Sequence, residues 1–421
     1  MANQIKRIAI ITSGGDSQGM NVAVRAVVLA ARQYDIEVVG IMDGYYGMTH
    51  KRPGDYRILR AEDVENIISR GGTVLNSARF EEFIDPEIVK RAAKNLEDEN
   101  IGALVICGGD GSFRGGLDIL KHGNIPCIGI PCTIDNDMTS TEYTLGFDTA
   151  LRISIDLADS LRDTCNSHKR CNVIEVMGRA CGQIALHTAI ATGATAVSVP
   201  ESPEEFDADE TIEKMIEARK NGKRSFLVVF AEGAEDLKAS KEAKEAAVKA
   251  AVADFEAGKI DEKKLSKTLA YNVTASFGEQ FVDMLQSRSK AAFAKYYEET
   301  GNLDFKGEYI ETKFARYAHT ARGGRPSPRD RVIASKMGEL AVDLIAAGQG
   351  NRVVCVHDGD VTSMDMVEAI HVDSVYRKYR KTGVEDAEAI AALTPLQQKL
   401  YRHRFEDNAA LIKAVKALSE V

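Results

Sequence analysis

Residues 7–21 read RIAIITSGGDSQGMN, a short apolar run followed by a glycine-rich turn and the start of a stretch with helical spacing. The run over residues 7–11 is rich in Ile and predicts a strand. Residues 21–34 are apolar nearly all round, which predicts a helix packed tightly on a sheet. Because this order of strand, turn and helix recurs along the chain, the sequence predicts β-α units with a parallel sheet, and hence an α/β fold.

The apolar runs form two series, separated by a helix expected from about residue 147 to residue 161. Expected strands lie at residues 36–41, 104–107, 127–130, 173–176, 196–199, 226–230 and 352–356. Helices are expected at residues 330–347 and in the tail from Asp386 onward. The 421 residues exceed the ~250 to 300 at which one hydrophobic core stops growing, so two α/β domains are expected.

Composition and charge exclude several classes of protein. Lys and Arg total 54 against 63 Asp and Glu, and the net charge of -9 disfavours a broad electrostatic grip on nucleic acid or on an anionic membrane. The N-terminal apolar run is too short for a membrane span or a signal peptide, so a cytoplasmic location is expected. The seven cysteines include no Cys-x-x-Cys pair and are expected to be buried free thiols.

The first motif, TSGGDSQG at residues 12–19, lies between a predicted strand and the N-terminus of a predicted helix. Backbone N–H groups and the helix dipole favour a phosphate at such a place, and glycines let the backbone approach it closely. The alternative is a tight turn that has only a structural role and binds no phosphate, because such a turn could have the same sequence.

The second motif, GGDGS at residues 108–112, follows the predicted strand at 104–107. Open α/β sheets bind ligands at the carboxyl ends of their strands. Asp110 is therefore a candidate magnesium ligand, with Ser112 and the glycine amides as candidate phosphate contacts. The alternative is a turn in which Asp110 caps the next helix.

The third motif, PCTIDND at residues 131–137, also follows a predicted strand. Phosphoryl transfer to an alcohol needs a carboxylate that accepts the hydroxyl proton, and Asp135 is the candidate, with Asp137 orienting it. The alternative is a pair of carboxylates on a solvated loop.

A fourth group of residues consists of cations near glycine-rich turns. In an acidic protein such residues are fitting phosphate clamps, since guanidinium binds phosphate bidentately, although each of them taken alone is more often a solvated charge. They are Arg79, Arg170, Arg179, His319 and Arg322.

The motifs resemble, in order, those of the phosphofructokinase family. The matching segments are TSGGDSQGMN, RGGTVLNSARF, GGDGS, PCTIDND, EVMGRACG and ARGGRPSPRDR. The resemblance covers most of residues 5–232 and 313–370. GGDG alone also occurs in lipid and NAD kinases of related fold, but these lack TIDND and MGR.

The resemblance implies two Rossmann-like α/β/α domains with a helical insertion at about residues 234–310. The nucleotide-binding domain would comprise residues 1–146 and 321–373, and the fructose 6-phosphate domain residues 147–320 and 374–421. The implied activity is transfer of the terminal phosphoryl group of ATP to the 1-hydroxyl of fructose 6-phosphate, giving fructose 1,6-bisphosphate. Mg2+ and a homo-oligomer, either a tetramer or a dimer, are also implied.

The resemblance also implies site residues. Asp135 falls on the position of the catalytic base, and Thr133 and Arg179 fall on those of transition-state stabilisers. Asp137 also falls on a catalytic position. The nucleotide positions are Gly15, Tyr45, Arg79, Phe80, Gly109, Asp110, Gly111 and Ser112, with Asp110 as the metal ligand. The sugar-phosphate positions are Thr133, Asp135, Asp137, Arg170, Met177, Gly178, Arg179, Glu232, Lys313, His319 and Arg322, with Arg170 and Lys313 at positions usually supplied by a neighbouring subunit.

The sequence departs from the family pattern at several positions. Lys313 replaces an arginine and cannot bind phosphate as a fork. The effector pocket of bacterial members keeps Arg25, Arg162 and Lys223, but has Leu29 in place of an arginine and Thr195 in place of a metal-coordinating glutamate. These departures put the usual control by ADP and phosphoenolpyruvate in doubt.

The residues at two positions commonly distinguish the family members that use ATP from those that use pyrophosphate as the phosphoryl donor. ATP-dependent members have glycine at both, whereas pyrophosphate-dependent members have aspartate at the first and lysine at the second. Here the residues are Gly111 and Cys132, and Cys132 matches neither pattern. ATP is predicted, because a carboxylate at residue 111 would repel the α-phosphate and a neutral thiol cannot replace the lysine charge.

Three alternatives remain open from the sequence. The first is a pyrophosphate-dependent phosphofructokinase. The second is a regulatory paralogue that keeps the fold without the chemistry. The third, an oxidoreductase with a nicotinamide cofactor, is disfavoured because no acidic residue clearly ends the second strand, where such enzymes bind the ribose.

Overall fold

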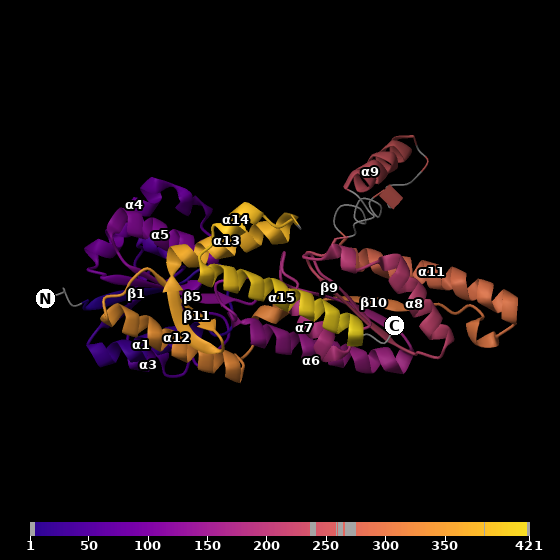
Figure 1. The fold of residues 1–421 in the computed structure, drawn as a ribbon, viewed down its shortest axis with the longest axis horizontal. Helices are drawn as coiled ribbons and strands as arrows, with labels where there is room; N and C mark the ends of the chain where they lie inside the picture. Colours follow the sequence, from indigo (N-terminus) through magenta and orange to yellow (C-terminus); the bar gives the residue numbers. More distant parts are fainter. Residues whose placement is uncertain are drawn as a thin grey trace. The chain divides into compact units, whose positions relative to one another are not determined.

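The computed structural model describes residues 5–235, 241–257, 259, 264–265, 275–382 and 384–418. The chain divides into two compact units. Unit 1 is Met1–Ile153 with His319–Asn408, and unit 2 is Ser154–Ala318 with Ala409–Val421. Each unit is built on its own sheet of mainly parallel strands, so the predicted α/β fold is confirmed (Figure 1).

The unit 1 sheet has the strand order β12-β11-β5-β4-β1-β2-β3, with the short β6 paired to β5. Its strands are β1 (Arg7–Thr12), β2 (Glu37–Ile41), β3 (Tyr56–Leu59), β4 (Ala103–Gly108), β5 (Cys127–Thr133), β6 (Leu145–Gly146), β11 (Arg352–His357) and β12 (Asp360–Asp365). The central strands β1, β4 and β5 run parallel, and every residue of β4 is buried. Only the edge strands β3 and β12 pair antiparallel to their neighbours among the described residues.

Helices cover both faces of the unit 1 sheet, with α4 and α5 on one face and α1 and α12 on the other (Figure 1). Helix α1 is buried along most of its length because it packs between the sheet and α12. The helices of unit 1 are α1 (Met20–Ala31), α2 (Tyr45–His50), α3 (Ala61–Val64), α4 (Pro86–Asp98), α5 (Asp110–Gly123), α12 (Pro328–Ala346), α13 (Met366–Thr382) and α14 (Ala387–Ala391). Helices α6 (Phe147–His168) and α15 (Pro395–Leu418) belong to unit 1 only in part.

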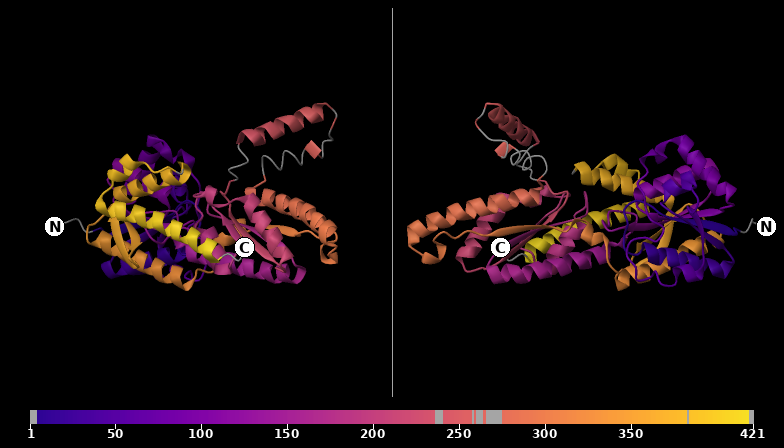
Figure 2. Two further views of the ribbon diagram at one scale, coloured as in Figure 1. Left: turned by 45° about the vertical axis from the view of Figure 1, so that its right-hand side comes forward. Right: turned by 180° about the vertical axis from the view of Figure 1, so that it is seen from behind.

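The unit 2 sheet has the order β10-β7-β9-β8 and is parallel throughout. Its strands are β7 (Cys171–Val176), β8 (Ala196–Ser198), β9 (Phe226–Ala231) and β10 (Thr312–Arg316), and its helices include α7 (Gln183–Thr192), α8 (Ala208–Lys220), α9 (Lys241–Glu256) and α11 (Phe277–Thr300). Figure 2 shows α8 and α11 on the face of this sheet opposite to α6. The core between these helices and the sheet contains Phe206, Phe230, Phe277 and Phe281. Phe206 and Phe230 each lie with their ring centroids 5.2 to 5.7 Å from those of the other rings.

The expected strands are present, and several are longer than predicted. β5 continues to Thr133, so Pro131 and Cys132 lie inside the strand rather than after it. Helices α9 and α11 lie in the predicted helical insertion, of which residues 236–240, 258, 260–263 and 266–274 are outside the described residues. Residues 374–408 belong to unit 1, and the predicted boundary, which places them in the second domain, differs here. Tyr376 and Tyr401 pack together there, with ring centroids 5.6 Å apart.

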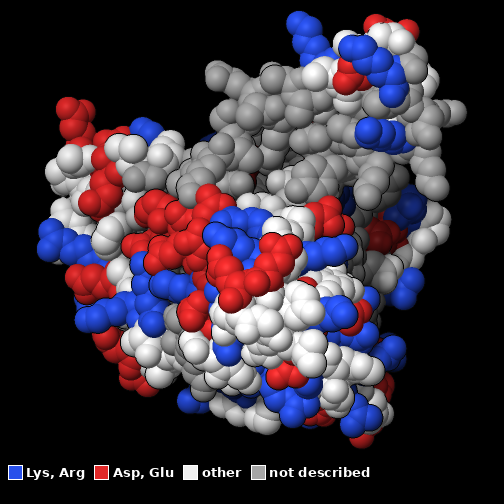
Figure 3. All heavy atoms as spheres, turned by 90° about the vertical axis from the view of Figure 1, so that its right-hand side faces the viewer, with Lys and Arg blue, Asp and Glu red and all other residues white. Residues whose placement is uncertain are grey.

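The seven cysteines are all buried free thiols, as predicted. On the face drawn in Figure 3, lysines and arginines are interspersed with aspartates and glutamates, and no broad cationic surface is visible there. Within the described part of the chain, no helix is both long and apolar enough to cross a membrane.

Candidate active site

The first motif forms the connection between β1 and α1. Ser13 donates its N–H to the carbonyl of Cys107 at 2.9 Å, which joins this loop to the end of β4. The side chain of Gln18 donates to the carbonyl oxygens of Ala321 and Gly323, at 2.8 and 2.5 Å. The loop is therefore fixed to two segments that are distant in the sequence.

Arg322 lies against this first loop. Its Nη1 donates to the carbonyl of Asp16 at 3.1 Å. A Cβ at Gly15 would lie 2.9 Å from the same nitrogen, so any side chain there would displace the guanidinium. The sequence had placed Gly15 and Arg322 in different subsites, but the structure brings them into contact within unit 1.

The second motif connects β4 to α5, which begins at Asp110. A Cβ at Gly109 or Gly111 would meet no heavy atom within 4 Å, so there is open space beside both glycines. Ser112 Oγ lies 3.7 Å from the Cβ position of Gly14, and the first and second loops are therefore adjacent. The hydroxyl of Tyr45 donates to the carbonyl of Ser112, and burial raises its pKa well above the usual value.

Asp110 is 8% exposed and lies between two guanidinium groups. Arg114 Nε and Arg377 Nη1 each donate to its Oδ2 at 2.9 Å. Arg114 comes from the next turn of α5, whereas Arg377 comes from α13, far along the chain. The motif predicts the carboxylate from the sequence but neither of its two arginine partners.

The third motif begins inside β5 and turns back after Asp135, which is 3% exposed. The N–H of Asp135 donates to Oγ1 of Thr133 at 3.2 Å. Asn136 has a positive φ of 50°, and its Oδ1 accepts the N–H of Thr144 at 3.1 Å. These contacts hold Asp135 at the carboxyl end of a central strand.

Asp137 contacts a third arginine, Arg380, which lies in α13. Arg380 Nη2 lies 3.4 Å from Oδ2 of Asp137, and the Arg380 side chain is only 4% exposed. Arg377 and Arg380 are three residues apart on α13 and therefore share a helix face. This single face contacts both the second and the third loop.

A buried carboxylate lies one turn before Arg377. Asp373 is 2% exposed and accepts the N–H and the Oγ–H of Ser140, at 2.7 and 3.0 Å. Burial, followed by the negative charges of Asp110 and Asp137, raises the pKa of Asp373 to about 7, although the hydrogen bonds from Ser140 act against this rise. Asp373 therefore fixes the segment that follows the third loop.

In unit 2, four predicted site residues lie together at the carboxyl ends of β7 and β9. Arg179 donates its N–H to Oε1 of Glu232 at 2.7 Å, and Glu232 donates its N–H to the carbonyl of Val176 at 2.9 Å. Met177 and Gly178 are buried in the same turn. The side chains of Arg179 and Glu232 are exposed.

Arg170 and Lys313 share one carboxylate where the neighbouring strands β7 and β10 of unit 2 begin. Arg170 Nε and Lys313 Nζ lie 2.6 and 3.0 Å from the two carboxylate oxygens of Glu311. These cations lower the pKa of Glu311, and Arg170 has the larger effect. Among the other predicted residues, Arg79 and His319 are exposed, and Phe80 packs against Tyr46 and Phe83.

Cys132 is buried in β5. It is 2% exposed, and burial, with the neighbouring Cys107 thiol, raises its pKa well above the usual value. The Cys132 side chain is therefore neutral, and it offers no charge to a phosphate.

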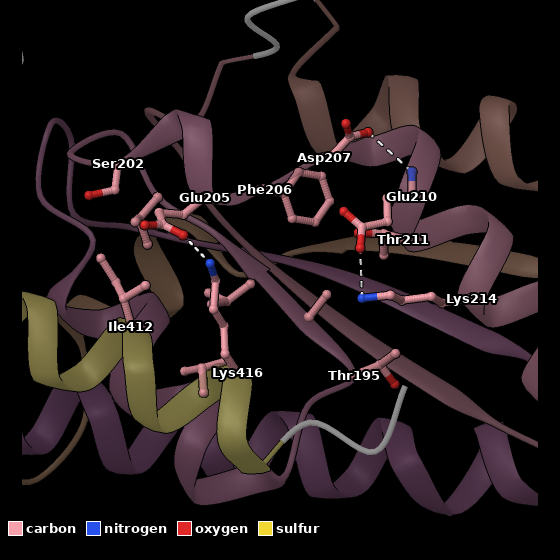
Figure 4. Close-up of a pocket in the computed structure, with 14 residues that line it drawn as sticks. Thr195, Ser202, Glu205, Phe206, Asp207, Glu210, Thr211, Lys214, Ile412 and Lys416 are labelled. Atoms are coloured by element: carbon pink, nitrogen blue, oxygen red, sulfur yellow. Dashed lines mark hydrogen bonds and ion pairs between the residues drawn. The ribbon is translucent and has the colours of Figure 1, made fainter.

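Among the described residues, unit 2 contains at least two cavities. One, of about 240 Å³, is lined by Arg162, Thr195 and Lys223, which are three of the effector positions discussed above. The other, of about 270 Å³, lies between α8, β8 and the end of α15 (Figure 4). Its lysines are already paired, Lys214 with Glu210 at 2.9 Å and Lys416 with Glu205, so it offers no uncompensated cation to a phosphate.

A magnesium ion would fit the donor set at Asp110 only together with a ligand. No group of three or more His, Cys, Asp or Glu suited to a metal occurs among the described residues. Mg2+ is commonly bound by one or two carboxylates plus substrate phosphates and water. One carboxylate beside the open space at Gly109 and Gly111 satisfies this requirement.

Comparisons with known proteins show the family of this chain. A sequence model of the family described as Phosphofructokinase matches residues 7–345. An ATP-dependent 6-phosphofructokinase of Bacillus cereus (strain B4264) is 38% identical over 366 residues, which are 87% of this chain and 94% of that protein.

Solved structures with the same fold come from two yeasts. The phosphofructokinase of Saccharomyces cerevisiae has a TM-score of 0.68 and 27% identity, and the match covers 94% of this chain but 49% of that chain. That of Pichia pastoris has a TM-score of 0.69 and 28% identity, with 96% of this chain and 39% of that chain covered. The chain thus spans half or less of the length of these two yeast subunits.

Proposed function

The chain belongs to the phosphofructokinase family, and from this premise we propose that it is an ATP-dependent 6-phosphofructokinase. It transfers the terminal phosphoryl group of ATP to the 1-hydroxyl of fructose 6-phosphate and forms fructose 1,6-bisphosphate. The observation that carries this proposal is the meeting of three loops at the carboxyl edge of the unit 1 sheet. Two glycine-rich turns lie there beside a loop that carries the buried carboxylate of Asp135.

We propose that Asp135 accepts the proton of the sugar hydroxyl as the phosphoryl group arrives. A carboxylate fixed at a strand end suits this role, because the base must be within hydrogen-bond reach of the proton. Thr133, which accepts the Asp135 N–H, and Asp137, which Arg380 anchors, are proposed to keep the base oriented. Arg179 is proposed to stabilise the charge that develops on the transferred group.

The remaining predicted residues are proposed as ligands of the two substrates. For the nucleotide these are Gly15, Tyr45, Arg79, Phe80, Gly109, Gly111 and Ser112. For the sugar phosphate they are Arg170, Met177, Gly178, Glu232, Lys313, His319 and Arg322. Tyr45 is buried and hydrogen-bonded to the loop backbone, so its proposed role is to shape the second loop.

Mg2+ is proposed as the cofactor, with Asp110 as its protein ligand. When bound, it would neutralise charge on the donor phosphates during transfer. Asp110 is positioned for this by its place at the first residue of α5 and by the two arginines that hold its carboxylate.

ATP is favoured over pyrophosphate as the donor by two observations. There is open space at Gly111, where a side chain would stand beside the nucleotide phosphates. Cys132 is buried and neutral, so it cannot supply the positive charge of a lysine. Pyrophosphate is the alternative donor.

The experiment is a coupled assay of fructose 1,6-bisphosphate formation by the purified chain, with Mg2+ and with either ATP or pyrophosphate. We expect turnover with ATP, and faster turnover with pyrophosphate would reverse the choice of donor. No product with either donor would overturn the proposal in favour of a regulatory paralogue.

The variant Asp135→Ala should lower kcat at least ~100-fold, the usual scale for loss of a general base. Asp98→Ala, on the exposed surface of α4, is the control for loss of an aspartate. Circular dichroism would establish that both variants are folded. Full activity of the Asp135 variant would remove this residue from the mechanism.

Assembly and location stay predictions. A homo-oligomer, tetramer or dimer, would be checked by light scattering coupled to size-exclusion chromatography. A cytoplasmic location would be checked by cell fractionation.

A further inference from the structure

Helix α13 presents three charged side chains to the loops of the candidate active site. They are Asp373, Arg377 and Arg380, at intervals of four and three residues, and they contact Ser140, Asp110 and Asp137, respectively. The three differ in exposure. Asp373 and Arg380 are buried, whereas the Arg377 side chain is 31% exposed.

Arg377 differs from Arg114, the other partner of Asp110, in how it is held. Arg114 donates both to Asp110 and to Oγ of Ser374, the latter at 2.5 Å, which ties α5 to α13. For Arg377, Asp110 is the ion-pair partner among the described residues. If the carboxylate of Asp110 changed its partner, the guanidinium of Arg377 would lose its counter-ion.

The net charge of the side chains around Asp110 indicates that an anionic ligand binds beside them. One carboxylate is shared by two guanidinium groups, so the cluster of Asp110, Arg114 and Arg377 carries a net positive charge. Open space adjoins it at Gly109 and Gly111. A cation that arrived alone at Asp110 would be repelled by both arginines, whereas a cation accompanied by phosphates would bring negative charge for them.

We propose that Arg377 is a ligand of the donor phosphates that Asp110 holds in position until the metal-bound donor arrives. The proposal rests on the proposed function. Asp110 then turns from the guanidinium to the metal, and Arg377 turns from Asp110 to the phosphate oxygens. The change of partner would be short, because the open space beside Gly109 and Gly111 adjoins the Asp110 carboxylate that Arg377 already contacts. The guanidinium Nη1 is already 2.9 Å from Oδ2 of Asp110.

This exchange of partners makes Arg377 act in opposite directions on two binding reactions. It opposes binding of a bare divalent cation at Asp110, since the two positive charges compete for one carboxylate. It favours binding of the metal–nucleotide complex, since the guanidinium gains a phosphate. A purely structural ion pair would affect both reactions in the same direction or neither.

The test compares the intact chain with Arg377→Gln in two titrations. The first is Mn2+ without nucleotide, followed by electron paramagnetic resonance, and the second is Mg·ATP, followed by calorimetry. In the variant we expect bare Mn2+ to bind several-fold more tightly, because the competing cation is gone. We expect Mg·ATP to bind at least ~10-fold more weakly, the lower end of the usual scale for loss of a hydrogen bond to a charged group.

Lys378→Gln is the matched control. It removes the same charge from the adjacent residue of α13, but Lys378 is 63% exposed and pairs with Asp386 at 2.7 Å. Both titrations should be unchanged in this variant. Arg377→Lys should keep the weak binding of Mn2+ and lose part of the Mg·ATP affinity, because lysine retains the charge without the fork.

The outcomes separate this inference from the proposed function. Unchanged affinities in Arg377→Gln, or two affinities that move in the same direction, overturn the role of Arg377 even if the chain phosphorylates fructose 6-phosphate. Opposite shifts in a chain that does not phosphorylate fructose 6-phosphate would keep the exchange and overturn the proposed function.

Discussion

The pH dependence of stability should report the protonation of Asp373. This side chain is 2% exposed, and its pKa is raised to about 7 because burial disfavours the charged form. In the unfolded chain an aspartate titrates near pH ~3.9. Between these values the folded state keeps a proton that the unfolded state has released, so this group's contribution to stability is complete below pH ~4 and is lost as the pH rises through about 7.

The magnitude follows from the same two values. Each unit of difference in pKa corresponds to about 1.4 kcal/mol, so the group should lower the free energy of unfolding by about 2 to 3 kcal/mol between pH 5 and pH 7. For a domain of this size the melting temperature changes by about 2 to 4 °C per kcal/mol. We therefore expect a shift of about 4 to 12 °C in the transition of unit 1.

The assay is differential scanning calorimetry of the wild type and of Asp373→Asn at pH 5 to 8 and constant ionic strength. Asparagine can still accept the N–H of Ser140, but it does not titrate in this range. The difference between the two proteins cancels the titration of the eight histidines. Asp98→Asn, an exposed aspartate on α4, controls for loss of one acidic side chain.

We expect the wild type to lose stability relative to Asp373→Asn as the pH rises from 5 to 7, and the difference to level off above that range. A difference that stays constant over the whole range, or that changes in the other direction, would refute the reasoning about burial. It would mean that Ser140 and the nearby arginines hold Asp373 in its charged form.

The other predictions concern the packing of each unit. Asp330→Ala should lower the free energy of unfolding of unit 1 by about 3 to 5 kcal/mol, because the buried Tyr143 hydroxyl and Gly146 N–H lose the acceptor that lies 2.7 Å from each. Calorimetry would measure it, and a loss below about 1 kcal/mol would contradict the assigned network. Phe281→Ala should destabilise unit 2 by about 3 to 5 kcal/mol, because the ring is fully buried beside Phe230. Hydrogen exchange in α11 would check this loss, and unchanged protection there would contradict it.

The sheets could be predicted because buried parallel strands are continuous apolar runs. β4 is buried at every position, and its sequence ALVICG shows this directly. The edge strands β3 and β12 were missed because they alternate little and contain exposed positions. Their pairing depends on the neighbouring strand rather than on an apolar pattern of their own.

The acidic and glycine-rich loops were predicted because each follows a strand that the sequence reveals. The arginines that hold them were not. Residues 373–380 read DSVYRKYR, in which three of the eight side chains are Arg or Lys and any of them could face solvent. The way in which α13 packs inside unit 1 shows that Arg377 and Arg380 face the loops. Lys378, between them, pairs with Asp386 instead.

Residues 374–408 contact the carboxylates that lie at the carboxyl edge of the unit 1 sheet. The carboxyl ends of parallel strands lie at the same edge of a sheet. The loops that carry Asp110, Asp135 and Asp137 follow the neighbouring strands β4 and β5, so all three carboxylates lie at this edge. Such a cluster is unfavourable until cations or hydrogen bonds compensate it. Helix α13 supplies Arg377 and Arg380, and α15 supplies the buried Arg404, which donates to the carbonyl oxygens of Met138 and Thr141. Residues 374–408 belong to unit 1, where Arg377 and Arg380 pair with carboxylates of its loops and Tyr376 and Tyr401 pack in a buried apolar cluster.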